Sequence, residues 1–128
     1  MMAVDPALRQ NHPEAAPFWD AAEKGIFVLP TCRACGRAHW YPRAFCPFCF
    51  SAGIDWAPSG GEGEIYSICN NRPAAGTDAV VYVRLDEGPT LLSHLVDHDP
   101  DTAAIGGRVK VVMKSGRNGE PFPVFRPL

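Results

Sequence analysis

The sequence predicts a mainly β protein with N-terminal helices, a compact cysteine module and a small closed barrel. Apolar residues recur at helical spacing near the start of the chain. Four of the five cysteines then stand as two C-x-x-C pairs. Short segments rich in β-branched residues follow, with no segment of helix length between them. We therefore divide the chain into a helical arm at 1–30, the cysteine module at 31–60 and the barrel at 61–128.

The composition is that of a globular domain, and it argues against two classes of protein. Hydrophobic residues make up 46% and charged residues 20% of the 128 positions. The net charge of -2 argues against nucleic-acid binding, because proteins of that class usually present a basic stripe. No apolar run reaches the length of about 18 residues that a membrane span requires.

The first 17 residues have neither the basic region nor the apolar core of a signal peptide. We therefore expect a cytoplasmic, reducing setting. In such a setting, paired cysteines more often bind a metal or carry out redox chemistry than form structural disulfides.

The helical arm carries a large apolar load for a short element. Pro13 suits a first helical turn, and Gly25 is expected to end the helix. The apolar side chains at helical spacing are Phe18, Trp19, Ala22 and Ile26. The adjacent rings of Phe18 and Trp19 must pack either on the core of this chain or on a partner, so both are candidate interface residues.

The cysteine module has the spacing of a four-sulfur metal site. Its ligands are Cys32, Cys35, Cys46 and Cys49, with ten residues between the two pairs. Two residues between cysteines let one tight turn direct both sulfurs at one ion, about 2.3 Å away. Gly36 suits a turn with positive φ, and Pro47 stiffens the second turn.

Other uses of these cysteines fit the sequence less well. Disulfides need an oxidising compartment, and a redox C-x-x-C normally occurs once, at the start of a helix. Tetrahedral sulfur sites suit zinc or iron, so zinc is expected and iron stays open. Because protein ligands fill all four positions, we expect a structural ion that replaces the hydrophobic core of a very short module.

Basic side chains gather in the cysteine module, which has no acidic residue from 25 to 54. They are Arg33, Arg37, Arg43 and His39. One interpretation is an anion site formed by Arg37, Trp40 and Arg43. The other is that the arginines balance the net charge of four thiolates around a divalent ion. Trp40 and Tyr41 are either exposed contacts or packing within the module.

The rest of the chain is predicted to form strands. The segments are 64–69, 79–85, 90–96 and 108–114, preceded by a turn-rich linker at 51–63. In the last segment, Val109, Val111 and Met113 alternate with a second set, Arg108, Lys110, Val112 and Lys114, as in a half-buried strand. The run 85–88, Leu-Asp-Glu-Gly, predicts a hairpin. Four or five short strands favour a closed barrel over a parallel sheet.

Three weaker candidates for chemistry lie in this region. Cys69 would need a base and an orienting group to act as a nucleophile, and a buried cysteine is the commoner case. His94 and His98 fall in a strand and the loop after it, so a shared metal is not implied. The acidic stretch 97–101 lacks the glycine and the distal glutamate of a calcium loop, which favours a solvated turn.

The order of short marks along the chain resembles one family. The marks are Phe18–Trp19, Gly25, Cys32, Cys35, Gly36, Pro42–Arg43, Cys46, Pro47, Cys49, Gly61 to Gly63, Leu85 to Gly88, Ile105–Gly106 and Phe125–Pro127. In this order they resemble the zinc-ribbon OB-fold family of acyl-CoA-associated proteins, over nearly the whole chain from about residue 15. The resemblance implies a rubredoxin-like zinc ribbon followed by a small OB-fold barrel.

The resemblance also implies a function. It suggests a non-catalytic accessory subunit that supports a thiolase-like enzyme, such as a lipid-transfer-protein-like thiolase or aldolase, or a MaoC-like enoyl-CoA hydratase. A hetero-oligomer such as a heterotetramer would be natural, and acyl-CoA of lipid or steroid metabolism would be the ligand near Arg37, Trp40 and Arg43. A short C-terminal tail and a compact segment at 70–79 leave little room for a private acyl-CoA pocket.

Two other functions stay open. A nucleic-acid-binding module would need exposed aromatic side chains and a basic groove on the barrel, for which Tyr66, Tyr82 and Arg84 are the candidates. Nearby acidic residues at Asp86 and Glu87 oppose that interpretation. An enzyme that uses Cys69 or the metal is the remaining alternative.

Overall fold

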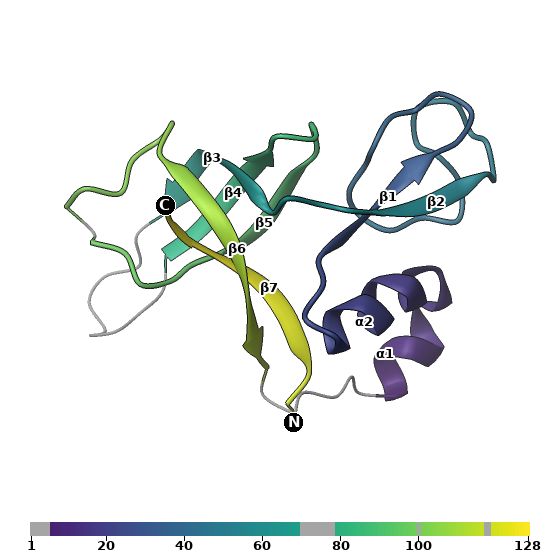
Figure 1. The fold of residues 1–128 in the computed structure, drawn as a ribbon, viewed down its shortest axis with the longest axis horizontal. Helices are drawn as coiled ribbons and strands as arrows, with labels where there is room; N and C mark the ends of the chain where they lie inside the picture. The colour runs from purple at the N-terminus through teal and green to yellow at the C-terminus, as the bar shows by residue number, and fades with distance from the viewer. Residues whose placement is uncertain (1–5, 70–78, 100, 117–118) are drawn as a thin grey trace. The chain divides into compact units, whose positions relative to one another are not determined.

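The computed structural model describes residues 6–69, 79–99, 101–116 and 119–128. The elements are α1 Pro6–Asn11, the 3-10 helix η1 Pro13–Ala15, α2 Ala16–Glu23, β1 Val28–Cys32, β2 Ile54–Pro58, β3 Glu62–Cys69, β4 Ala79–Leu85, β5 Thr90–Leu95, β6 Arg108–Ser115 and β7 Pro121–Pro127 (Figure 1). One compact unit comprises residues 1–60 with 113–122, and the other comprises 61–112 with 123–128. The predicted mainly β fold with N-terminal helices is confirmed.

The N-terminal helices end where the sequence predicted. The backbone N–H of Gly25 donates to Ala22 O at 2.9 Å, and that of Ile26 donates to Ala21 O at 2.9 Å. With a φ of +76° at Gly25, these bonds form the Schellman motif, which caps the last carbonyls of α2. Ile26 therefore lies beyond the helix, 46% exposed, and is not part of the apolar face.

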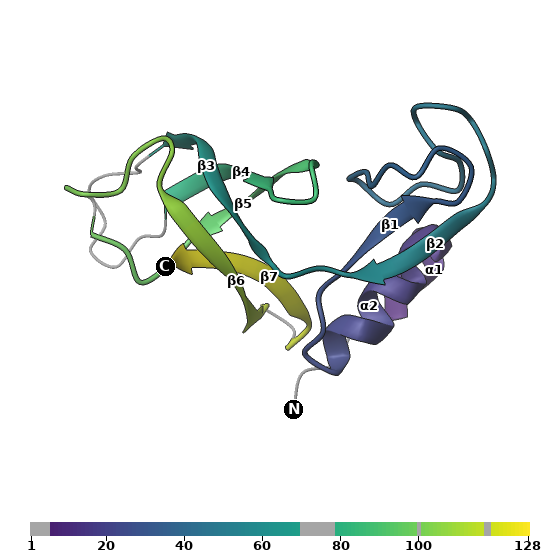
Figure 2. The same ribbon diagram turned by 45° about the horizontal axis from the view of Figure 1, so that its top comes forward.

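The first unit contains a two-stranded antiparallel sheet that the sequence did not reveal. Strand β1 pairs with β2 from Val28 opposite Pro58 to Cys32 opposite Ile54. The helix α2 lies against β1 in both views (Figures 1 and 2). The interpretation of 51–63 as a linker was therefore wrong for 54–58, and also for 62–63, where β3 begins. The long loop between β1 and β2 carries three of the paired cysteines, because only Cys32 lies in a strand.

The second architectural element is a closed barrel with the strand order β3-β4-β5-β7-β6. The four predicted strands are all present, and β7 is the fifth. The Leu85–Gly88 hairpin is confirmed, since Gly88 N donates to Leu85 O at 2.9 Å and β4 pairs antiparallel with β5. Burial alternates along β4, which places Val81, Val83 and Leu85 inside and their neighbours outside.

The barrel closes tightly around Gly63. A Cβ at this position would lie 2.3 Å from the carbonyl oxygen of Arg84 on β4, so only glycine fits between β4 and β6. On the surface, the two terminal guanidinium nitrogens of Arg108 donate to the two carboxylate oxygens of Asp86, at 2.9 and 2.7 Å. This pair joins β6 to the turn after β4 and lowers the pKa of Asp86 from its usual value, chiefly through these hydrogen bonds.

Candidate metal centre

Two similar turns, or knuckles, hold the paired cysteines. In the first knuckle, Gly36 N donates to Cys32 O at 2.9 Å, and Cys32 N donates to Arg37 O at 3.0 Å. In the second, Phe50 N donates to Cys46 O at 2.9 Å, and Cys46 N donates to Ser51 O at 2.8 Å. The two C-x-x-C segments thus repeat one backbone structure. Gly36 has a φ of +75°, as its glycine predicted.

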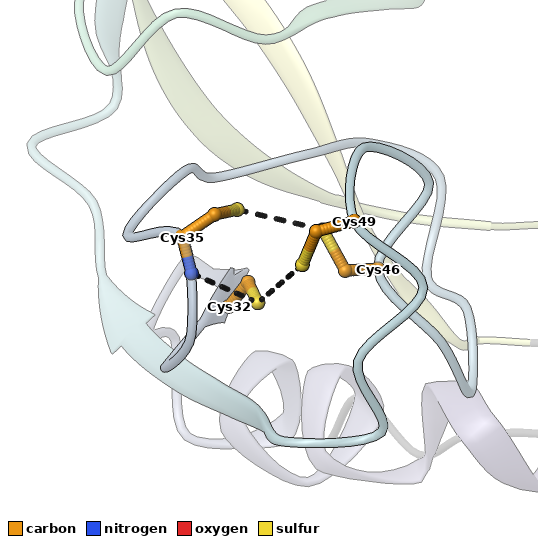
Figure 3. Close-up of side chains that lie close together, drawn as sticks. All are labelled: Cys32, Cys35, Cys46 and Cys49. Carbon is orange, nitrogen blue, oxygen red and sulfur yellow. Dashed lines mark hydrogen bonds between the residues drawn. The ribbon is translucent and has the colours of Figure 1, made fainter.

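The four sulfurs converge on one point (Figure 3). The Sγ atoms of Cys32 and Cys49 are 3.5 Å apart, and those of Cys35 and Cys46 are 3.7 Å apart. All four lie within 4.8 Å of one another. A tetrahedron with metal–sulfur bonds of about 2.3 Å has edges of about 3.8 Å. The site is therefore sized for a metal ion held by four sulfur ligands, and within the described residues it is the one such cluster.

The protein backbone favours thiolate at part of this cluster. The backbone N–H of Cys35, 3.5 Å from Cys32 Sγ, contributes most to lowering the pKa of Cys32 to about 6, against the effect of burial. At Cys49, the N–H of Ser51 lowers the pKa, but the neighbouring Cys32 thiol and burial raise it to about 12. Without a cation, Cys32 thus favours the thiolate form and Cys49 the thiol form. A divalent ion removes this conflict, because it favours the thiolate form at all four positions.

The three arginines of the module have different surroundings. Arg33 forms an ion pair with Asp55, just beyond the stretch that lacks acidic residues. The guanidinium of Arg37 lies over the ring of Phe48, 3.6 Å from its centroid. Arg43 is exposed and has no ion-pair partner within the described residues. Because Arg33 is paired with a carboxylate, the three arginines do not share one role. For Arg37 and Arg43, an anion site and the balancing of thiolate charge both stay predictions.

The predicted interface pair divides into one buried and one half-buried ring. Phe18 is only 3% exposed and meets the rings of Trp19, Phe27 and Trp40 edge-on or nearly so, at centroid distances of 5.1, 6.3 and 5.2 Å. This burial assigns Phe18 to the core of the chain itself, which corrects its prediction as a partner contact. Trp19 is half-buried and stays a candidate. Trp40 serves partly as internal packing, whereas Tyr41 is 51% exposed.

His39 is a buried polar residue that the sequence did not single out for this reason. It is 2% exposed, and neither ring nitrogen has a hydrogen-bond partner within the described residues. Burial, together with the charge of Arg43, lowers the pKa of His39 below its usual value. His39 is therefore neutral near pH 7 and does not add to the positive charge of the module.

Within the described residues, the weaker candidates belong to no group of three or more side chains that could hold a metal. Cys69 is exposed at the end of β3, where it pairs with Val80 of β4, so it is not the buried cysteine that we considered. His94 is exposed on β5, and His98 lies in the loop after it. In the stretch 97–101, Asp101 N donates to Asp99 Oδ1 at 2.9 Å, which is a local turn. Pro100 lies outside the described residues, as does most of 70–79.

The barrel carries the exposed aromatic side chains that a nucleic-acid interface would need. Tyr66 is 52% and Tyr82 is 45% exposed. Arg84 lies over the Tyr66 ring, 4.7 Å from its centroid, and also lies 3.9 Å from a carboxylate oxygen of Glu64. The positive charge on this face is thus partly balanced.

Comparison with known proteins assigns both parts of the chain. Residues 19–55 match the model of the ChsH2 rubredoxin-like zinc ribbon domain, and residues 56–114 match that of the ChsH2 C-terminal OB-fold domain. A DUF35 domain-containing scaffold protein from Methanothermobacter thermautotrophicus is 33% identical over 93 residues, which cover 67% of this chain and 70% of the relative. The chain belongs to the DUF35 family. Its predicted ribbon and OB-fold barrel are thereby confirmed, as is the resemblance on which they rested.

Two solved structures share the fold. A structure described as Ltp2-ChsH2(DUF35) aldolase matches with a TM-score of 0.75 and 30% identity, covering 88% of this chain and 93% of the other. A DUF35 protein of unknown function from Sulfolobus solfataricus matches with a TM-score of 0.65 over 91% and 86% of the two chains. At 16% identity, the second match shows the fold alone. Within the described residues, this DUF35 chain has no helix long and apolar enough to cross a membrane.

Sequence reasoning missed the exposed phenylalanines of the second knuckle. Phe45, Phe48 and Phe50 are 59%, 46% and 79% exposed. A signal was present in the sequence, because the first C-x-x-C pair is followed by glycine and the second by Phe50.

Proposed function

We propose that this chain is a non-catalytic accessory subunit that binds and supports a thiolase-like enzyme of acyl-CoA metabolism. The observation that carries the proposal is the match over 88% of this chain to a DUF35 chain whose structure is described as an aldolase with Ltp2. The description of the Methanothermobacter relative as a scaffold protein agrees with it. An aldolase of the thiolase-like class is therefore the partner that we favour over a hydratase.

The ligand set supports a structural metal, and we propose zinc. All four positions around the ion are filled by cysteines, which leaves no position for water or substrate. Iron would accept the same four sulfurs, so elemental analysis of the purified protein decides between the two ions. A stoichiometric content of iron instead of zinc would correct this assignment.

Acyl-CoA is the proposed ligand of the complex rather than of this chain alone. Arg43 is the candidate phosphate contact, because Arg33 is paired with Asp55 and Arg37 is stacked on Phe48. Trp40 is half-buried, which limits its contact with a ligand. These residues do not indicate whether the acyl group is fatty, aromatic, short or steroid.

Nucleic-acid binding is the second candidate, and the exposed Tyr66 and Tyr82 favour it. Glu64 beside Arg84 and the net charge of -2 weigh against it. Titration with single-stranded DNA and RNA at increasing salt distinguishes the two functions. Micromolar binding with a steep salt dependence would favour nucleic acid.

Co-expression with thiolase-like subunits from the same organism tests the proposed function. We expect a complex of defined stoichiometry, such as a heterotetramer, with the enzyme subunit dependent on this chain for stability or turnover. A Cys69→Ala variant should keep the turnover of the complex, because the proposal gives Cys69 no chemistry. A zinc-loaded monomer that ignores every thiolase-like and hydratase partner would overturn the proposal.

A further inference from the structure

The second knuckle displays three phenylalanine rings to solvent within six residues. Phe45, Phe48 and Phe50 are 59%, 46% and 79% exposed, respectively. Single exposed apolar residues are ordinary, but a cluster of them marks an interaction surface. Phenylalanine has no polar atom with which to compensate its exposure to water.

Phe50 is also unfavourable for the backbone. Its hydrogen bond to Cys46 O repeats the bond from Gly36 to Cys32 O, so Phe50 occupies the position that glycine occupies in the first knuckle. Its φ is +65°, in the left-handed region that suits glycine and disfavours bulky side chains. The ring is therefore exposed and conformationally costly, and the isolated chain gains no burial from it. Residues held in such conformations cluster at functional sites.

The charges around these rings are positive. The Arg37 guanidinium lies over the Phe48 ring, and Arg43 precedes Phe45 by two residues without an ion-pair partner in the described part of the chain. No acidic residue occurs from 25 to 54. Aromatic side chains and arginine are the residue types enriched at the centres of protein–protein interfaces.

The exposed face of the barrel differs in chemistry. Its rings are those of Tyr66 and Tyr82, whose hydroxyl groups remain favourable in water. Arg84 covers the Tyr66 ring and approaches Glu64, so both the ring and the charge have partners within the chain. Leu92, opposite Tyr82, is also exposed, so this face presents one aliphatic side chain beside two tyrosines, against three phenylalanines at the second knuckle.

We propose that Phe45, Phe48, Phe50 and Arg37, here called the knuckle surface, form the docking site for the enzyme subunit. The proposal rests on the proposed function and specifies the partner surface: an apolar depression that receives the rings, bordered by carboxylates that face Arg37. The description of the relative's structure, which couples a DUF35 chain with an aldolase, identifies the class of occupant.

Two other occupants suit the knuckle surface less well. A second copy of the chain, bound through the same surface about a two-fold axis, would bring the arginines of both copies together. A phosphate or the diphosphate of acyl-CoA would use the guanidinium but would leave the phenylalanine rings in water. An apolar protein surface with acidic borders would both bury the phenylalanine rings and pair with the charge of Arg37.

The test measures the affinity of single variants for the purified thiolase-like subunit that co-purifies with the wild-type chain. Phe50→Asn removes the ring at a position where asparagine tolerates the positive φ, so the knuckle keeps its fold. We expect the dissociation constant to rise about 30-fold for Phe50→Asn and for Phe48→Ser, as for residues at the centre of an interface. Metal content and thermal unfolding verify that each variant is folded.

Matched controls lie on the barrel. Tyr82→Ser and Leu92→Ser remove side chains that are 45% and 58% exposed, and Tyr82 lies opposite Leu92 across β4 and β5. We expect both to bind the enzyme subunit with wild-type affinity. Arg37→Glu should weaken binding more strongly at low salt than at high salt, because it places a carboxylate opposite the carboxylates that we propose on the enzyme subunit.

The outcomes separate this proposal from the proposed function. If the wild-type chain binds the enzyme and the barrel variants weaken binding while the knuckle variants do not, the knuckle surface is refuted and the accessory role stands. If the wild-type chain binds no thiolase-like subunit, both fail. Self-association that Phe50→Asn abolishes would identify a second copy as the occupant, and acyl-CoA binding lost in Arg37→Glu but kept in Phe50→Asn would identify an anion site. Either result would overturn the docking proposal.

Discussion

At the scale of single residues, the two knuckles provide an internal comparison. Gly36 and Phe50 share the same hydrogen bond and nearly the same φ, +75° and +65°. The backbone alone would favour glycine at both. At position 50 the fold therefore holds a phenylalanine in a backbone conformation that favours glycine. The effect of this conformation on the free energy of unfolding can be measured.

We predict that Phe50→Gly raises the free energy of unfolding by about 1 kcal/mol, because it relieves the left-handed backbone conformation. Phe45→Gly is the matched control, since Phe45 is also exposed but is not among the residues with positive φ. It should lower the free energy of unfolding by about 0.5–1 kcal/mol. Chemical denaturation of the metal-loaded proteins measures both. Equal destabilisation by the two variants would contradict a conformational cost at Phe50.

His39 gives a second prediction at this scale. Because neither ring nitrogen of this buried side chain is hydrogen-bonded within the described residues, His39→Leu should raise the free energy of unfolding by about 1 kcal/mol at pH 7.

The variant should also change the pH dependence. The folded pKa of His39 lies below its usual 6.5, since burial and Arg43 disfavour the charged ring. Below pH 6.5 the unfolded chain binds a proton that the folded chain resists, so wild-type stability falls as the pH falls toward the folded pKa. His39→Leu removes this part of the decline. His94→Gln, on the exposed side of β5, should leave the free energy of unfolding at pH 7 unchanged.

At the scale of elements, the sequence predicted those strands whose pattern is local. The segments that became β3 to β6 are rich in β-branched residues and are bounded by turn residues, and β4 alternates strictly between buried and exposed positions. Strands β1, β2 and β7 were not identified. Pro30, Pro58 and Pro121 interrupt their patterns, and proline usually argues against a strand. These three strands depend on pairing with distant segments, which a local pattern does not reveal.

In the candidate site, too, the features with a local sequence pattern were predicted and those that depend on distant segments were not. Cysteine spacing predicted all four sulfur ligands, because two tight turns are short enough to be recognised in sequence. The surroundings of Arg33, Arg37 and Phe18 depended on tertiary contacts. Asp55 reaches Arg33 only because β2 pairs with β1, and Phe18 is buried only because Trp40 and Phe27 meet it.

Gly63 provides the prediction for the barrel. A methyl group here would lie 2.3 Å from Arg84 O and 3.0 Å from Leu85 Cα, both backbone atoms that cannot rotate away. Gly63→Ala should therefore lower the free energy of unfolding by about 3 kcal/mol or more. Gly60→Ala is the control, because a Cβ there meets nothing within 4 Å. Thermal unfolding of the two variants gives the comparison, and equal midpoints would refute this account of barrel closure.

At the scale of the whole molecule, the two parts have different sources of stability. The barrel buries a set of large apolar side chains: Val81, Val83, Leu91, Leu95, Val109, Val124 and Phe125. The loop between β1 and β2 has little comparable burial from 33 to 53 apart from His39, Pro42 and Cys46. For this loop, the ion must supply the cross-links that a hydrophobic core supplies in the barrel.

This difference predicts the effect of removing the metal. A strong chelator should make the amides of 32–53 exchange rapidly with solvent, because structural zinc contributes about 10 kcal/mol or more to the folding of small modules. The amides of β4 and β5 should stay protected, since their core includes none of the four ligands. Hydrogen exchange with mass spectrometry measures both regions, and Cys46→Ser should reproduce the effect of the chelator whereas Cys69→Ser should not. Protection of the loop that survived chelation would mean that its side chains, and not the ion, hold the two knuckles together.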